Sequence, residues 1–335
     1  MVEFAIWHWL AFGALVVFLL ALDLVVFHRH AHAPSFLESA GWSAFWIGLA
    51  LVFNGFVCWW RGTEAGVQFL SGYLIEKSLS MDNIFVFAVI FRFFAVPLMY
   101  QYRVLFWGIL GAIVLRLAFV LTGTALIHRF DWVMAVFGAL LVYTAVKLVR
   151  PGEEEVDPER NPLLRTARRF LPVASGDGGK HFFVRQSGRW CITPLFLVLL
   201  VVESTDVVFA VDSVPAVFGV TRDPFLVFTS NIFAILGLRA LYFLLANVIE
   251  AFRYLHYGLS AVLAFVGLKM VAEYWLAPAG EHLVSPAVSL AVVAFLLTTS
   301  VVASLVAQLH ERPSIPVASA VGIEAIKTEE EVPVR

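Results

Sequence analysis

Residues 192–220 read ITPLFLVLLVVESTDVVFAVDSVPAVFGV, and this run limits the kind of protein that the chain can form. It is apolar over a length beyond the ~20 residues that a helix needs to cross the hydrocarbon core of a bilayer. Because backbone amide groups cannot stay unpaired in lipid, such a run predicts a transmembrane helix. Three carboxylates in the run, Glu203, Asp206 and Asp212, then lie at membrane depth.

Apolar runs of similar length occupy most of the chain. Together with the first they cover residues 4–27, 42–60, 66–94, 104–127, 132–149, 192–220, 224–249, 256–277 and 285–308. Of the 335 residues, 61% are hydrophobic and 14% are charged, whereas soluble domains are roughly 45–50% apolar and about 25% charged. A soluble enzyme and a disordered chain are therefore excluded. We expect an all-α polytopic membrane protein with about nine transmembrane helices in a lipid bilayer.

The basic residues between the runs predict the orientation in the membrane. If the N-terminus lies outside, the outer segments hold only Arg61, Arg129 and Arg222. The inner segments then hold Arg29, Arg92, Arg103, Arg253 and the many basic residues of 150–191. Since Lys and Arg concentrate on the cytoplasmic side, we expect a multi-pass protein of the bacterial inner (plasma) membrane, with its N-terminus outside and its C-terminus in the cytoplasm. The net charge of −2 gives no reason to expect nucleic acid as a partner.

The runs and the breaks between them predict six segments along the chain. They are an N-terminal two-helix segment (1–65), a first transmembrane repeat (66–149), a cytoplasmic loop (150–191), a second transmembrane repeat (192–277), a final transmembrane helix (278–309) and a cytoplasmic tail (310–335). The loop is rich in charge, Pro and Gly, so we expect it to be solvated and partly disordered.

An internal repeat relates the second and fourth of these segments. Asp82-Asn83-Ile84-Phe85 aligns with Asp206-Val207-Val208-Phe209, and Arg116 and Arg239 fall at corresponding places. Each copy holds three spans, and copies with an odd number of spans insert in opposite directions. Inverted three-helix repeats are common in secondary transporters, whose binding site lies at the repeat interface near the membrane midplane.

Five carboxylates mark the candidate site, and they lie in the third and sixth predicted helices. They are Glu76, Asp82, Glu203, Asp206 and Asp212. Each costs ~2.5–3.5 kcal/mol to insert, so we expect a functional site rather than five structural ion pairs. Glu76 and Asp82 are six residues apart and point to different sides of a regular helix. Either the helices unwind locally or two sites lie next to each other, and Pro215 favours unwinding.

The chemistry expected at this site is that of a hard, all-oxygen metal site. Carboxylates together with Asn83, Ser204 and Asn231 suit Mg²⁺, Ca²⁺ or Mn²⁺, and no His or Cys lies beside the acids to favour Zn²⁺ or Cu⁺. Arg116 and Arg239 are expected to act as counter-ions of the carboxylates. No cofactor is expected, because the metal ion is the cargo.

The residues around the acids resemble a known family. Glu76-Lys77-Ser78-Leu79-Ser80-Met81-Asp82-Asn83, Glu203-Ser204-Thr205-Asp206, Asp212-Ser213-Val214-Pro215 and the stretch 229–239 are similar to the signature segments of the TerC/Alx family. The resemblance covers roughly residues 5–310, and the 150–191 loop matches least well. It implies a protein of the LysE-like transporter superfamily that exports manganese, with tellurite resistance and alkaline-pH induction as historical labels of the family.

Three functions are compatible with these features. The first is a Mn²⁺ exporter that exchanges the metal with protons, because metal binding to carboxylates displaces protons; no GxxxxGK[ST] motif indicates an ATPase. The second is an intramembrane aspartyl protease using Asp82 and Asp206, although neither lies in a Gly-x-Gly-Asp motif. The third is a membrane scaffold for the assembly or metallation of exported proteins. We expect a transporter rather than an enzyme, with a divalent metal ion and protons as partners and with the oligomeric state left open.

Overall fold

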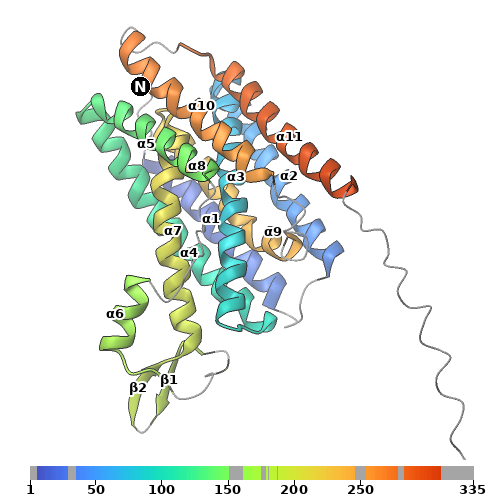
Figure 1. Cartoon of the computed structure of the whole chain (residues 1–335), viewed down its shortest axis with the longest axis vertical. Helices are drawn as coiled ribbons and strands as arrows, with labels where there is room; N and C mark the ends of the chain where they lie inside the picture. The colour runs from blue at the N-terminus through green and yellow to red at the C-terminus, as the bar shows by residue number, and fades with distance from the viewer. Residues whose placement is uncertain are drawn as a thin grey trace, which may run out of the picture.

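The computed structural model describes residues 6–28, 35–150, 161–174, 179, 181–186, 188–245, 254–277 and 283–310 (Figure 1). Most of the predicted tail, 310–335, therefore lies outside the described residues. The elements, in chain order, are α1 (Ile6–His28), α2 (Phe36–Arg61), α3 (Thr63–Phe93), α4 (Leu98–Arg129), α5 (Trp132–Val149), α6 (Pro162–Phe170), β1 (Phe183–Gln186), β2 (Arg189–Ile192), α7 (Pro194–Phe218), α8 (Pro224–Leu236), α9 (Leu238–Leu245), α10 (Leu255–Leu276) and α11 (Pro286–His310).

The predicted helical class is confirmed, and each of the nine apolar runs contains a helix. Within the described residues, seven helices are long and apolar enough to span a membrane, and the bent pair α8–α9 makes an eighth candidate. The remaining run, α3, carries Glu76, Lys77 and Asp82. It contacts α2, α7, α8 and α11, so neighbouring helices shield it from lipid. The chain is a polytopic membrane protein, and nine spans stay a prediction.

The two helices that carry the acids, α3 and α7, pack side by side and run antiparallel. Near the start of α3, a Cβ on Gly72 would lie 3.0 Å from Val217, which is close to the end of α7. Further along α3, Phe87 lines the same small cavity as Val202, which lies in the first half of α7. Inverted repeats require this opposite direction. Whether 66–149 and 192–277 superpose as inverted units stays a prediction.

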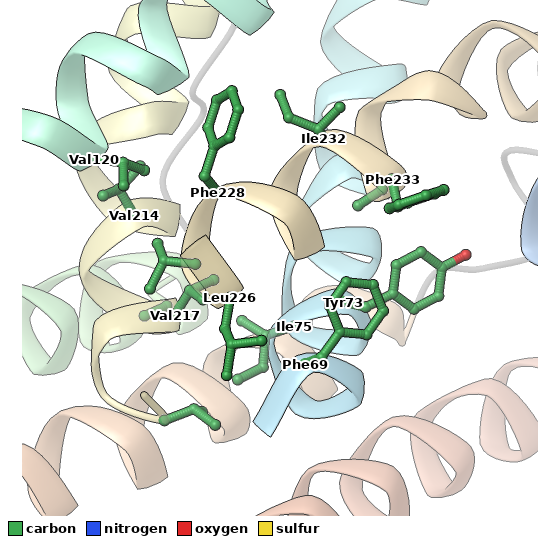
Figure 2. Close-up of a cluster of buried hydrophobic side chains, with 14 of the residues drawn as sticks. Phe69, Tyr73, Ile75, Val120, Val214, Val217, Leu226, Phe228, Ile232 and Phe233 are labelled. Atoms are coloured by element: carbon green, nitrogen blue, oxygen red, sulfur yellow. The ribbon is translucent and has the colours of Figure 1, made fainter. Parts of the chain in front are cut away.

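The apolar core forms two clusters, and the polar segments of α3 and α7 lie between them. One cluster includes Phe69, Ile75 and Val217 and is completed by α8 (Figure 2). The other includes Phe87 of α3 and Val202 of α7. Along both helices, the acidic residues fall between the stretches that belong to the two clusters. The charged groups are thus held in the middle of the bundle, away from both of its ends.

The helix break expected in the third and sixth runs lies elsewhere. α3 is continuous over 31 residues, and α7 is continuous over 25 residues despite Pro215, so the prediction of local unwinding at the acids is wrong. The break occurs at Gly237, where α8 and α9 meet at an angle of 41°. Lys77 Nζ donates to the Ala234 carbonyl at 3.2 Å. The ammonium group therefore satisfies a carbonyl at the negative end of α8.

Proline and a capping side chain fix the start of three helices. Asn161, Thr193 and Asp223 accept hydrogen bonds from backbone N–H groups of α6, α7 and α8, and a proline follows each of them. Such residues satisfy amide groups that a helix start leaves unpaired, and proline fits the first helical position. Asp223 also forms an ion pair with Arg61 at 2.5 Å, which ties the end of α2 to the start of α8.

The segment predicted as a solvated loop is partly folded. Within 150–191, the structure describes α6 and a β-hairpin in which Phe183 pairs with Ile192 and Gln186 with Arg189. The turn of the hairpin contains Gly188, whose φ of 80° suits glycine. α6 forms because Leu164 and Ala167 are buried one turn apart. A helix of nine residues with two buried positions is too short to be predicted from long apolar runs.

Two glycines let α5 and α10 approach closely. A Cβ on Gly138 would lie 2.7 Å from the Gly267 carbonyl, and a Cβ on Gly267 would lie 2.6 Å from the Gly138 carbonyl. Both obstacles are backbone atoms, so the helices must separate to accept a side chain. Small residues commonly permit such contacts between membrane helices.

We therefore predict that Gly138→Ala and Gly267→Ala each destabilise the protein by about 1–3 kcal/mol, the usual cost of overpacking. Gly48→Ala in α2 is the matched control, because nothing lies within 4 Å of its new Cβ and alanine favours a helix over glycine by ~1 kcal/mol. Thermal unfolding in detergent measures the difference. A midpoint for either variant as high as that of the control contradicts the prediction.

Candidate cation site

The centre of the bundle contains a buried ion pair between α3 and α4. Glu76 Oε1 lies 2.5 Å from Arg116 Nη1, and the side chains are 0% and 1% exposed. Arg116 Nη1 also donates to Asn231 Oδ1 at 2.6 Å, while Asn231 Nδ2 donates to the Val227 carbonyl at 2.8 Å. Three helices, α3, α4 and α8, are thereby joined at one point. Glu76 therefore has its counter-ion within the protein.

Asp206 lies beside this ion pair and belongs to the same electrostatic group. It interacts with both Arg116 and Glu76 and is 5% exposed. Its Oδ2 atom has no hydrogen-bond partner among the described residues. Asp206 and Asn83 line a cavity of about 10 Å³, a volume comparable to the room that one water molecule needs. This small cavity leaves Asp206 able to bind a proton or a water molecule.

Glu203 is the third acid of this group. It interacts electrostatically with Asp206, which lies one turn further along α7. Its carboxylate lies directly against Gly111 of α4, where a Cβ would overlap the carboxylate oxygens. The absence of a side chain at Gly111 therefore makes the space that Glu203 occupies. Glu203 and Asp206 are three residues apart, a spacing that puts them on one helix face, and both lie toward α4.

A larger cavity lies between α3, α5, α7 and α10, and it holds the other two acids. Asp82 and Asp212 line it together with Asn83, Thr144 and Lys147, and its volume is about 150 Å³. Thr144 Oγ1 donates to Asp212 Oδ1 at 2.9 Å. Lys147 interacts electrostatically with the same carboxylate. The cavity thus combines carboxylate, amide and hydroxyl oxygens with one ammonium group.

The five predicted acids therefore form two groups, not one. Asp82 shares its cavity with Asp212, whereas Asp206 lies with Glu76 and Glu203. Asp82 and Asp206, which align with each other in the internal repeat, line different cavities. Asn83 lines both cavities and is the residue that links them. In the part of the chain that the structure describes, no three His, Cys, Asp or Glu side chains form a metal-binding group.

Two of the predicted supporting residues contact other parts of the protein. Arg239 forms a buried ion pair with Asp23 of α1 and also donates to the Asp23 carbonyl, and Asp23 is not one of the five predicted acids. Ser204 accepts a hydrogen bond of 2.5 Å from Asn161 Nδ2 at the start of α6. The folded part of the 150–191 segment is thereby attached next to Glu203.

Three partners of these groups, Asp23, Thr144 and Lys147, are not among the residues predicted from the sequence. Asp23 is the sole acid in the apolar run 4–27, and an isolated acid at that depth is a signal that a partner is required. Thr144 and Lys147 lie one turn apart on α5. Their spacing matched that of one helix face, but nothing in the sequence indicated which neighbour that face contacts.

Comparisons with known proteins agree with this arrangement of a membrane helix bundle. A family model described as the integral membrane protein TerC family matches residues 61–312. The chain is 53% identical to an uncharacterized membrane protein of Myxococcus xanthus over 303 residues, which cover 90% of this chain and 93% of the relative. It is 46% identical over 304 residues to the Alx protein of Salmonella typhi, covering 88% and 92%, and 48% identical over 272 residues to Alx of Escherichia coli strain K12, covering 78% and 85%.

The names of the two Alx relatives describe them as candidate membrane-bound redox modulators. No solved structure matches the chain. The family model covers well over half of the sequence, including α3, α4, α7 and α8, which carry both groups of acids. The chain belongs to the TerC family of integral membrane proteins.

Proposed function

We propose that the chain is a secondary transporter that exports a divalent metal ion, with Mn²⁺ as its main substrate, across the bacterial inner membrane in exchange for protons. The observation that carries the proposal is the cavity of about 150 Å³ that Asp82 and Asp212 line together. Its residues come from the antiparallel helices α3 and α7 and from α5 and α10. A transporter can open such a site to either side by moving these helices relative to each other.

The chemistry of this cavity suits a hard divalent cation as cargo. Two carboxylates supply charge, and Asn83, Thr144 and Ser213 add neutral oxygen atoms. A cargo must also be released, and few charged ligands give weaker binding than the carboxylate-rich cages of resident ions. Lys147 at the same cavity balances negative charge when no cation is bound.

Exchange with protons supplies the energy for export. Moving a doubly charged ion outward against a potential that is negative inside costs about 4.6 kcal/mol per 100 mV. Exchange of two protons for one Mn²⁺ moves no net charge and removes this cost. Glu203 and Asp206 are adjacent carboxylates within one electrostatic group. We assign to them the two protons that move in the opposite direction to the metal, one on each carboxylate.

The redox names of the Alx relatives fit a metal transporter better than a thiol enzyme. Cys58 and Cys191 are both free cysteines. Cys58 packs against Gly66 near the start of α3, whereas Cys191 lies in β2, close to the start of α7 and hence near the end of α3. A dithiol between them is therefore ruled out by distance. We propose that any effect of this chain on redox balance arises through the metal that it moves.

The first prediction concerns the cavity acids. Asp82→Asn and Asp212→Asn should each lower the initial rate of Mn²⁺ uptake into everted membrane vesicles at least about tenfold, the effect of losing about 1.4 kcal/mol of binding. Asp131→Asn is the matched control, since Asp131 is exposed just before α5. Full uptake by either cavity variant removes the site from the pathway. If cells that carry a variant without uptake keep the wild-type phenotype, a scaffold function is the better account.

The second prediction concerns the coupling ion. In proteoliposomes, a pH gradient alone should drive Mn²⁺ against its concentration gradient, with the potential clamped at zero by potassium and valinomycin. Two protons per Mn²⁺ make the cycle electroneutral, so the clamp should leave the rate unchanged. Radioactive or dye-detected Mn²⁺ flux provides the measurement. A flux that follows the potential and ignores the pH gradient contradicts exchange with protons.

The third prediction separates structure from transport at Glu76 and Arg116. Arg116→Gln alone should destabilise the protein by about 3–5 kcal/mol, because it leaves a buried carboxylate without its partner. The double variant Glu76→Gln/Arg116→Gln should recover much of this loss, since no buried charge remains unpaired. Unfolding midpoints in detergent test both statements. Equal losses in the single and double variants would mean that the ion pair is not the source of the stability.

A further inference from the structure

The folded part of the 150–191 segment forms a strongly basic surface at one end of the bundle. It consists of exposed arginines on α6 and on the β-hairpin, namely Arg165, Arg168, Arg169, Arg185 and Arg189. Arg92 and Arg103, near the facing ends of α3 and α4, add positive charge to the same end. We call the five arginines of α6 and the hairpin the basic surface.

Large apolar side chains are exposed next to these arginines. Phe170 is 74% exposed at the end of α6, Trp190 is 69% exposed in β2 and Phe183 is 52% exposed in β1. Their exposure is not the consequence of an unfolded segment, because Leu164 and Ile192 from the same elements are buried in the core. A folded element that presents both arginines and aromatic rings matches the composition of segments that lie at a membrane surface.

The position of α6 places this surface at the level where α7 enters the bilayer. α7 has 25 residues and is therefore ~37 Å long, longer than the ~30 Å hydrocarbon core. Asn161, at the start of α6, bonds to Ser204 within α7, and the hairpin leads directly into the first turn of α7. Figure 1 shows α6 and the hairpin beside the lower part of α7, below most of the bundle. Ser204 lies ten residues inside α7, so α6 starts within the bundle, and the chain after α6 returns to the start of α7, where the Ile192 N–H donates to the Pro172 carbonyl at 2.9 Å. The end of α6 and the hairpin thus lie in the headgroup region of one leaflet.

The helix α6 also has the right distribution of side chains around its axis. Leu164 and Ala167 face the protein and are buried. At 100° per residue, Leu163 and Phe170 lie on one flank of this buried stripe, and Arg165 and Arg168 lie on the other. An interfacial helix places its apolar flank toward the acyl chains and its arginines toward the phosphates, which long arginine side chains can reach.

We propose that the basic surface binds the headgroups of anionic phospholipids in the leaflet beside it. The guanidinium group pairs with phosphate through two parallel hydrogen bonds, and each basic residue near an anionic surface strengthens binding about fivefold. The hydrogen bond between Asn161 and Ser204 connects the bound element to α7. The surface therefore has a ligand of its own, separate from the metal pathway.

Electron paramagnetic resonance of spin-labelled lipids tests the proposal on the full chain in phosphatidylcholine vesicles. The measured quantity is the motionally restricted fraction of labelled phosphatidylglycerol relative to labelled phosphatidylcholine. The wild type should prefer phosphatidylglycerol, and the preference should fall as NaCl is raised, since salt screens exposed charges. Arg168→Gln/Arg169→Gln should lower the preference at least about twofold. Arg168→Lys/Arg169→Lys should keep most of it, because the charge remains.

The matched control is Arg129→Gln/Arg222→Gln, which removes two exposed arginines outside α6 and the hairpin. It should leave the lipid preference unchanged. An equal loss in the control would mean a general effect of charge and would overturn the assignment to this surface. An unchanged preference in Arg168→Gln/Arg169→Gln would also overturn it and point to an acidic protein as the partner. If that variant does not fold, Arg185→Gln/Arg189→Gln makes the same test on the hairpin.

Discussion

The ion pair between Glu76 and Arg116 is the interaction on which the rest of the bundle depends. It allows α3, a helix with charged residues near its middle, to occupy the centre of a membrane protein. Its extension to Asn231 fixes α8 against the same point. The break at Gly237 follows directly after this contact, where Lys77 satisfies the Ala234 carbonyl. A single set of charge-assisted bonds thus determines how α3, α4 and α8 meet.

The two groups of acids have different surroundings, which suit them to different roles. Around Glu76, Arg116 already provides the positive charge, and the adjoining cavity has room for little more than a water molecule. Around Asp82 and Asp212, the cavity is much larger and the positive charge comes from the flexible side chain of Lys147. A tightly held pair suits a structural anchor, whereas a flexible ammonium group can be displaced by an arriving cation. Asn83 lines both cavities and is thus the contact between the two groups.

Much of the fold was predictable from sequence, because apolar length directly predicts membrane helices. The pairing of the acids was not. Asp82 and Asp206 lie at a similar level on the two antiparallel helices, since Gly72 packs near Val217 and Phe87 near Val202. An alignment of repeats does not show which side of its helix each residue faces. Asp82 faces the cavity that Asp212 also lines, whereas Asn83 lines a second cavity with Asp206. The two-site alternative for Glu76 and Asp82 describes the structure better than unwinding, since each side of the regular helix α3 serves one group. The pairing of Asp23 and the attachment of α6 to α7 were not predicted, because their partners are distant in sequence.

The charge of α3 has a consequence for how the ribosome and the translocon build this protein. α3 is absent from the described helices that are apolar enough to enter lipid unaided, and each of its buried charges opposes entry by ~2.5–3.5 kcal/mol. Its counter-charge, Arg116, is made shortly afterwards as part of α4, so the two helices enter the bilayer most easily as a hairpin. Asn231 is synthesised only after α7 and completes the set of bonds. The order of synthesis therefore matches the order in which the ionic and hydrogen-bonding contacts form. In a nascent chain that stalls before α4, α3 has no counter-ion and stays at the translocon.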